Sequence, residues 1–235
     1  MRTSRLSSEN IMPLLQRFLM LAVLMCAGSA VLAQGEDSNM DLAKDRHGVK
    51  VWTYPIPNYP IRGFKAVTVV KSSLAGLINL IMDTDNAPTW VYRTNRIDVI
   101  KRDDAAESFI IHVETDFPWP LKDRDVYVQG KIAQDPKTLV VTITSQSTPA
   151  GTYPVDPAFV RMPDMQGVWQ FKPLGKGMVE VTMSGRADPS GVIPAAVTNL
   201  VIQETPYNTM LGLKDVIGAD KYQKVFLKQI QEPTE

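Results

Sequence analysis

The chain has 235 residues, 44% of them apolar, and its 25 lysines and arginines balance 25 aspartates and glutamates. This balance leaves no basic excess to neutralise a phosphate backbone, so it argues against nucleic acid as a partner. The length is enough to bury one sizeable core without cross-links, and it fits a single domain behind a leader segment.

Residues 1–33 have the pattern of a secretory signal peptide. Three arginines precede an uncharged apolar run over residues 18–27, and Ala33 ends a small-residue cleavage site. The run is shorter than the roughly 20 residues that a membrane-spanning helix needs; an uncleaved anchor is the alternative. We therefore expect cleavage near Ala33 and a periplasmic or secreted protein. Because Cys26 is the only cysteine, the mature chain would have no disulfide, thiolate metal site or cysteine nucleophile.

The first segments of the mature chain are short. After a polar lead over residues 34–40, the segment 41–47 is predicted to be a helix capped by its first residue. Alternating apolar residues predict a strand at 49–54 and a hairpin partner at 61–70. Ser73 then caps a helix whose apolar residues recur at helical spacing.

A run of strands follows this helix. Partial alternation of apolar and polar residues places them at 95–101, 108–115, 125–134, 138–146, 167–173 and 178–187. A proline-rich loop, 149–163, separates the last two from the others. Gly175 and Gly177 indicate that the last two strands form a hairpin.

The last segment, from Ile193 to about Leu227, is predicted to be a long amphipathic helix. Pro194 occupies a tolerated first-turn position, and Pro206 should kink the helix. The order of elements predicts an α+β domain over residues 40–230, in which a curved antiparallel sheet wraps around a long C-terminal helix.

One turn in this chain is both rigid and charged. Pro118 and Pro120 bracket Trp119, which fixes two backbone angles and removes two amide donors. Arg124 and Asp125 then open the next strand. We interpret these five residues as a structural corner; recognition of a ligand head group is the alternative.

Five stretches of the sequence resemble the START domain family of steroidogenic-acute-regulatory-related lipid-transfer proteins. In order they are DRHGVKVWTYPIP (45–57), NAPTWV (86–91), PWPLKDRDVYV (118–128), GVWQFKPLGKGMVEVTM (167–183) and GVIPAAVTN (191–199). The resemblance implies a helix-grip fold with an internal tunnel for one lipid, and it implies binding and transfer without chemistry.

One departure from the family bears on the ligand. Sterol-carrying animal members have a buried arginine six residues after the arginine of the Arg-Asp pair, and this chain has Gly130 there. A sterol ligand is therefore in question, while Gly130 is expected to free room for a bulkier ligand. Asn199 matches the asparagine of the family's last stretch and is the main polar candidate in the tunnel.

Strand and helix periodicity, together with the resemblance for Gly130 and Asn199, selects the residues that would line the tunnel, with ordinary core packing as the alternative. They are Trp90, Phe109, Ile111, Val113, Val128, Gly130, Trp169, Phe171, Val181, Met183, Val197, Asn199, Leu200 and Val201.

The sequence contains few candidate catalytic or metal-binding residues. His47 has no companion ligand for a metal, and His112 is expected to be an outward or hydrogen-bonded core histidine, with contact to a ligand as the alternative. The acidic turn 83–86 lacks the glycine and distal glutamate of a calcium loop. We expect no catalytic residue, metal or cofactor.

The lipid interpretation implies a bound lipid, transient membrane contact and a monomer. The natural lid is the loop 149–163 together with the helix kink at Pro206. Two alternatives stay open: an enzyme on the same scaffold, such as a cyclase or hydrolase acting on an apolar substrate, and a sensor or assembly protein with a filled core.

Overall fold

The structure is a computed structural model, and it describes residues 39–234 except 60, 195–196 and 199. Its elements are β1 (Asp41–Arg46), β2 (Val49–Tyr54), β3 (Gly63–Lys71), α2 (Leu74–Met82), the 3-10 helix η2 (Thr84–Thr89), β4 (Thr94–Asp103), β5 (Ser108–Thr115), β6 (Arg124–Gln134), β7 (Val141–Ser147), β8 (Val160–Arg161), β9 (Met165–Gly175), β10 (Met178–Ala187), the π-helix η3 (Leu200–Glu204), α4 (Thr205–Val216) and α5 (Asp220–Gln223).

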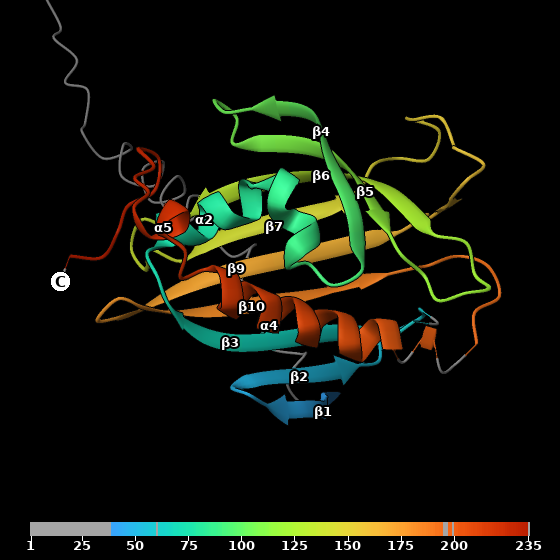
Figure 1. Cartoon of the computed structure of the whole chain (residues 1–235), viewed down its shortest axis with the longest axis horizontal. Coiled ribbons are helices and arrows are strands. Elements are labelled where there is room, and N and C mark those ends of the chain that lie inside the picture. Colours follow the sequence, from blue (N-terminus) through green and yellow to red (C-terminus); the bar gives the residue numbers. More distant parts are fainter. Residues whose placement is uncertain (1–38, 60, 195–196, 199, 235) are drawn as a thin grey trace, which may run out of the picture. The chain divides into compact units, whose positions relative to one another are not determined.

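The strands of the described part form one curved sheet in the order β1-β2-β3-β10-β9-β7-β6-β5-β4. All neighbours on this path are antiparallel, and the short β8 pairs in parallel with the start of β6. The sheet bends around α4, while α2 packs beside it on the same face (Figure 1). This arrangement confirms the predicted helix-grip architecture.

The core lies between the concave face of the sheet and these two helices. Alternate residues of each central strand turn inward, and they meet the fully buried side chains of Leu77, Leu80, Met210 and Leu213. A second, smaller cluster of Val126, Val128 and Met162 lies near the start of β6.

Several local predictions are confirmed. Ser73 is the N-cap of α2, and its hydroxyl oxygen accepts a hydrogen bond from the amide of Gly76. The hairpin between β9 and β10 turns at Gly175, Lys176 and Gly177, all three with positive φ.

Two predicted helices differ from the structure. Residues 41–46 form the edge strand β1, because their backbone pairs with β2; a cap residue is a weaker signal than a neighbouring strand. The C-terminal helix does not run from 193 to 227. A π-helical turn precedes α4, Pro206 lies in the first turn of α4, and α4 ends at Val216 before the exposed Gly218.

Candidate functional site

Inward-facing side chains of the sheet fall into two groups that differ in burial. Four of the predicted tunnel residues, Trp90, Phe109, Phe171 and Val181, are buried in the main core, at most 8% exposed. Val128 is buried in the smaller cluster. These residues pack against protein atoms and support the walls of the site.

The second group is apolar, faces inward and is only half-buried. From the prediction it contains Ile111, Val113, Trp169 and Met183, and the structure adds Met165 and Ala187. Met165 and Ala187 are cross-strand partners on β9 and β10, two residues beyond Gly167 and Gly185 on the same face. Period-two alternation through those glycines would have found them.

The half-buried residues lie where the two core clusters meet. Val113 contacts the smaller cluster, Trp169 and Met183 contact the main core, and Ile111 contacts both. Apolar side chains that face the concave side of a sheet, yet keep exposed surface, are candidates to line a ligand site.

Trp90 has the one buried polar group beside this face that has no partner within the described residues. Its indole Nε1 is shielded from solvent and makes no hydrogen bond. The ring meets Trp169 edge-on at 6.3 Å between centroids, and Trp169 stacks on Phe171 at 6.2 Å. An unpaired buried N–H costs about 1–3 kcal/mol, so an acceptor arriving at this position would be stabilised.

The expectation that Gly130 frees room for a ligand is wrong. Gly130 pairs with Phe109 across β5 and β6, and a Cβ at Gly130 would clash with the Phe109 ring. The aromatic ring therefore fills the space that the missing side chain leaves.

The β1–β2 hairpin and the loop before β4 hold α4 on the sheet. Glu204 pairs with Lys44 at 2.7 Å, and the Tyr207 hydroxyl lies 2.8 Å from Nδ1 of His47. From the other side, the amide of Tyr92 donates to the Thr209 hydroxyl at 3.2 Å.

The chain before α4 carries the remaining predicted residues. Val197 and Val201 are half-buried there, Leu200 opens the π-helix η3, and Asn199 lies outside the described residues. The three side-chain contacts described above involve Glu204, Tyr207 and Thr209, at the end of η3 and in the first half of α4.

The corner at Pro118, Trp119 and Pro120 is tied to the loop that leads into this stretch. The guanidinium of Arg124 is buried over the Phe117 ring, 4.2 Å from its centroid. It donates to the carbonyls of Pro189 at 3.0 Å and Ser190 at 3.3 Å, and also to that of Lys122. Arg124 therefore joins two loops, whereas the arginine that pairs with Asp125 is Arg161.

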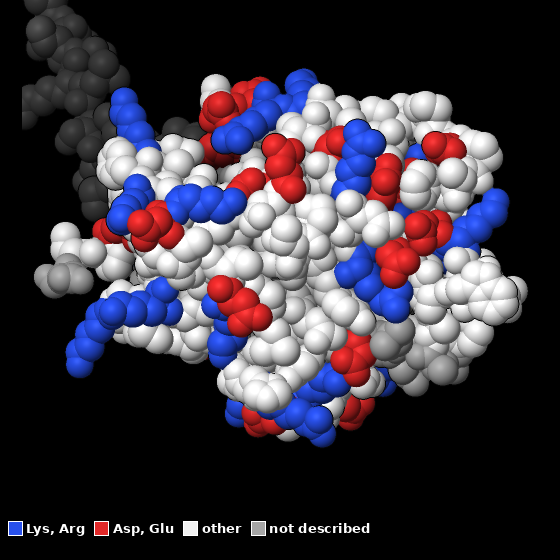
Figure 2. All heavy atoms as spheres, viewed as in Figure 1, with Lys and Arg blue, Asp and Glu red and all other residues white. Residues whose placement is uncertain are grey.

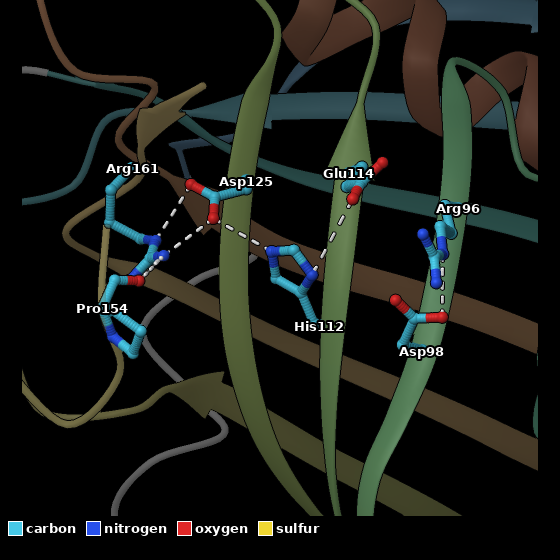
Figure 3. Close-up of polar contacts among 7 residues, drawn as sticks. All are labelled: Arg96, Asp98, His112, Glu114, Asp125, Pro154 and Arg161. Carbon is cyan, nitrogen blue, oxygen red and sulfur yellow. Dashed lines mark hydrogen bonds and ion pairs between the residues drawn. The ribbon is translucent and has the colours of Figure 1, made fainter. Parts of the chain in front are cut away.

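Asp125 organises a separate network on the outer face of the sheet (Figure 3). Its carboxylate is fully buried and accepts two hydrogen bonds from Arg161, at 2.9 and 2.8 Å. Nε2 of His112 lies 2.9 Å from the same carboxylate. Burial alone would raise the pKa of Asp125, but the hydrogen bonds and charges of Arg161 and His112 hold it below its usual value.

This network fastens the loop 149–163 to the outer face. Tyr127 stacks on Tyr153 of the loop at 4.1 Å and on His112 at 4.3 Å, and Arg161 lies over the Tyr127 ring. The expectation of a hydrogen-bonded His112 is confirmed. Its ring is on the face opposite Ile111 and Val113, so it does not border the half-buried surface.

No group of three or more potential metal ligands converges in the part of the chain that the structure describes. None of the described helices is long and apolar enough to cross a membrane.

A curved antiparallel sheet that grips one C-terminal helix defines the helix-grip class of folds. The chain belongs to the START domain family, whose model matches residues 43–214.

Similar proteins agree with this assignment. An uncharacterized protein of Pseudomonas aeruginosa is 28% identical over 197 residues, which cover 83% of this chain and 95% of that protein. The human mitochondrial StAR-related lipid transfer protein 7 is 24% identical over 144 residues, 60% of this chain and 38% of that protein.

Solved structures show the same fold. A STAR-related lipid transfer protein from Xanthomonas axonopodis superposes with a TM-score of 0.70 at 24% identity, covering 77% of this chain and 99% of that one. Human StAR-related lipid transfer protein 5 gives 0.67 at 13% identity, with 89% and 92% coverage.

Proposed function

We propose that this protein is a non-catalytic carrier that holds a single lipid between the concave face of its sheet and the segment leading into α4, outside the cytoplasm. The half-buried apolar surface of Ile111, Val113, Trp169, Met183 and their neighbours carries the proposal. Membership of the START domain family and the lipid-transfer names of its relatives support it.

The energetics favour a carrier that needs few specific contacts. Each buried methylene contributes about 0.8 kcal/mol, so enclosing a 16-carbon chain gains on the order of 12 kcal/mol over water. Shape then selects the chain, and the unpaired indole N–H of Trp90 is the candidate donor to an ester or hydroxyl oxygen.

Three loops would surround the opening of the lipid site, which we call the mouth: the corner at Pro118 to Pro120, the loop 149–163 and the loop that contains residues 189–192. Arg124 ties the corner to residues 189–190, and the ammonium of Lys122 donates to the Pro157 carbonyl at 3.1 Å, which ties the corner to the loop 149–163. Each loop presents one exposed apolar side chain: Trp119 at 91%, Val192 at 97% and Val155 at 63%. Such a triplet fits shallow contact with a membrane during loading and release.

Native mass spectrometry of the protein purified from its own host tests the proposal. We expect one lipid molecule per chain, released on denaturation and identified by fragmentation. Protein that is free of lipid, and that takes up none from vesicles, would instead support a filled core. Sequencing the N-terminus of the same sample tests cleavage near Ala33.

The mouth makes a second prediction. Replacing Trp119 and Val192 with serine should slow lipid transfer between vesicles about tenfold, because membrane contact loses two large apolar side chains. Lipid bound at equilibrium should not change. Leu42→Ser, at the exposed Leu42 of β1, is the matched control, and equal transfer rates in all three proteins would contradict the assignment of the mouth.

A further inference from the structure

Two segments far apart in the sequence share one pattern, in which an exposed apolar residue is flanked by lysines two positions away on each side. They are KPLGK at residues 172–176 and KVFLK at residues 224–228. Leu174 is 48% exposed and Phe226 is 84% exposed. We call the two segments together the tail-end surface.

Local structure explains why both apolar side chains point to solvent. Leu174 is near the end of β9, where the register with β10 shifts from Pro173–Val179 to Gly175–Met178 and leaves Leu174 without a cross-strand partner. Residues 225–227 are non-helical; Val225 and Leu227 are half-buried, and Leu227 packs on the main core. Phe226 lies between them and is turned outward.

The two segments lie at the same end of the fold. One groove of about 310 Å³ is lined both by the hairpin residues Pro173 and Gly175 to Val179 and by the tail residues Gln223 and Glu232 to Thr234. Figure 1 shows the β9–β10 hairpin and the C-terminal segment together at the left, whereas the loop 188–194 and the start of α4 lie at the right. The tail-end surface is thus remote from the proposed mouth.

Several lysines project into solvent at this end of the fold. Within the described residues, Lys172, Lys176 and Lys228 have no ion-pair partner, and the pair of Lys224 with Asp220 is largely exposed on both sides. Figure 2 shows blue side chains projecting at the same end.

Glu232 is a carboxylate of the tail that lines the same groove as Lys176. It is exposed, but its two oxygens accept hydrogen bonds from the amides of Leu74 and Ala75 at the start of α2. Glu180 faces Lys172 across the β9–β10 pair without forming an ion pair.

We propose that the tail-end surface docks on an anionic lipid surface. Lysines that flank a protruding apolar side chain combine electrostatic attraction to anionic head groups with shallow insertion of that side chain. The proposal extends the carrier function, because it gives the protein two membrane-binding ends and lets one molecule contact two membranes at once.

Co-sedimentation with vesicles tests the surface apart from the mouth. The starting protein carries Trp119→Ser and Val192→Ser, and the vesicles are either phosphatidylcholine alone or equal parts phosphatidylcholine and phosphatidylglycerol. We expect binding only to the anionic vesicles, lost at high salt. Adding Lys176→Glu and Lys228→Glu should weaken it by more than about 30-fold, since each lysine near an anionic surface contributes about a factor of five and each glutamate adds repulsion.

Matched variants separate charge from insertion. Leu174→Ser with Phe226→Ser should weaken binding while keeping its salt dependence. Lys50→Glu with Lys101→Glu changes the same charge at lysines outside the tail-end surface and should have a much smaller effect. Equal weakening by this control would show that only net charge matters, and would overturn the proposal.

Clustering of vesicles tests whether one molecule can contact two membranes at once. The wild-type chain should cluster anionic vesicles, measured by light scattering, and loss of either end should abolish clustering. A dimer that dissociates on Phe226→Ser would instead identify the surface as an interface between copies and overturn the proposal. Copurifying lipid is measured on the same variants, so failure of the carrier function would appear as its absence, independently of clustering.

Discussion

Replacing Asp125 with alanine should lower the free energy of unfolding by about 3–5 kcal/mol, the typical cost of removing one partner from a buried ion pair. The substitution leaves the guanidinium of Arg161 and the imidazole of His112 without their shared carboxylate. It also releases the loop 149–163 from the sheet. Denaturant unfolding of the purified variant measures the loss.

Asp98→Ala is the matched control for this prediction. Asp98 pairs with Arg96 at 2.9 Å on β4, also drawn in Figure 3, but both side chains are at least 36% exposed. An exposed pair contributes about 0–1 kcal/mol. Similar losses in the two variants would show that the Asp125 network is not a buried anchor.

Because the pKa of Asp125 is lowered, the stability that this residue contributes should depend on pH. A carboxylate whose pKa is lower in the folded than in the unfolded state stabilises the fold above its unfolded pKa of about 3.9. That contribution is lost as the pH falls through the folded-state pKa. The stability difference between wild type and Asp125→Asn should therefore be constant near neutral pH and shrink under acid conditions.

Sequence signals correctly predicted the features that depend on nearby residues: a helix cap, two strands and the turn between them. Ser73 was identifiable as an N-cap because its side chain satisfies an amide only three residues away. The strands β9 and β10 were identifiable from alternation, and their turn from the two glycines. The order of these elements predicted a curved sheet around a C-terminal helix, and the START resemblance implied the same helix-grip fold.

The features that sequence reasoning missed depend on contacts between distant residues. β1 is a strand because its backbone pairs with β2. Phe109 fills the space at Gly130 because the register of β5 and β6 places the two residues opposite each other. The C-terminal helix ends early because the tail turns back, buries Tyr222 and caps α2 with Glu232. No periodic pattern encodes these pairings.

The candidate site was also predicted only in part. Alternation found which residues face inward, yet it could not tell the buried Phe171 from the half-buried Trp169, two positions away on the same strand face. That difference depends on what covers each residue. It separates the buried residues that support the site from the half-buried residues that are candidates to line it.

Filling the half-buried surface separates a lipid cavity from a filled core. Val113→Phe together with Ala187→Phe adds two rings where the inner face is only half-buried. If the space holds a lipid, bound lipid should fall at least about tenfold, since displacing two methylenes already costs about 1.6 kcal/mol. The lipid-free protein should keep its stability, because the rings enter empty volume.

A filled core gives the opposite result, which makes the experiment decisive. Forcing two rings into close-packed protein costs about 1–3 kcal/mol for each site, and there would be no bound lipid to lose. Thr182→Phe is the control, because Thr182 is on the opposite face of β10 from Ala187; it should leave bound lipid unchanged. Lipid content by mass spectrometry and stability by denaturant unfolding must therefore be measured on the same samples, because only loss of lipid with retained stability identifies a cavity.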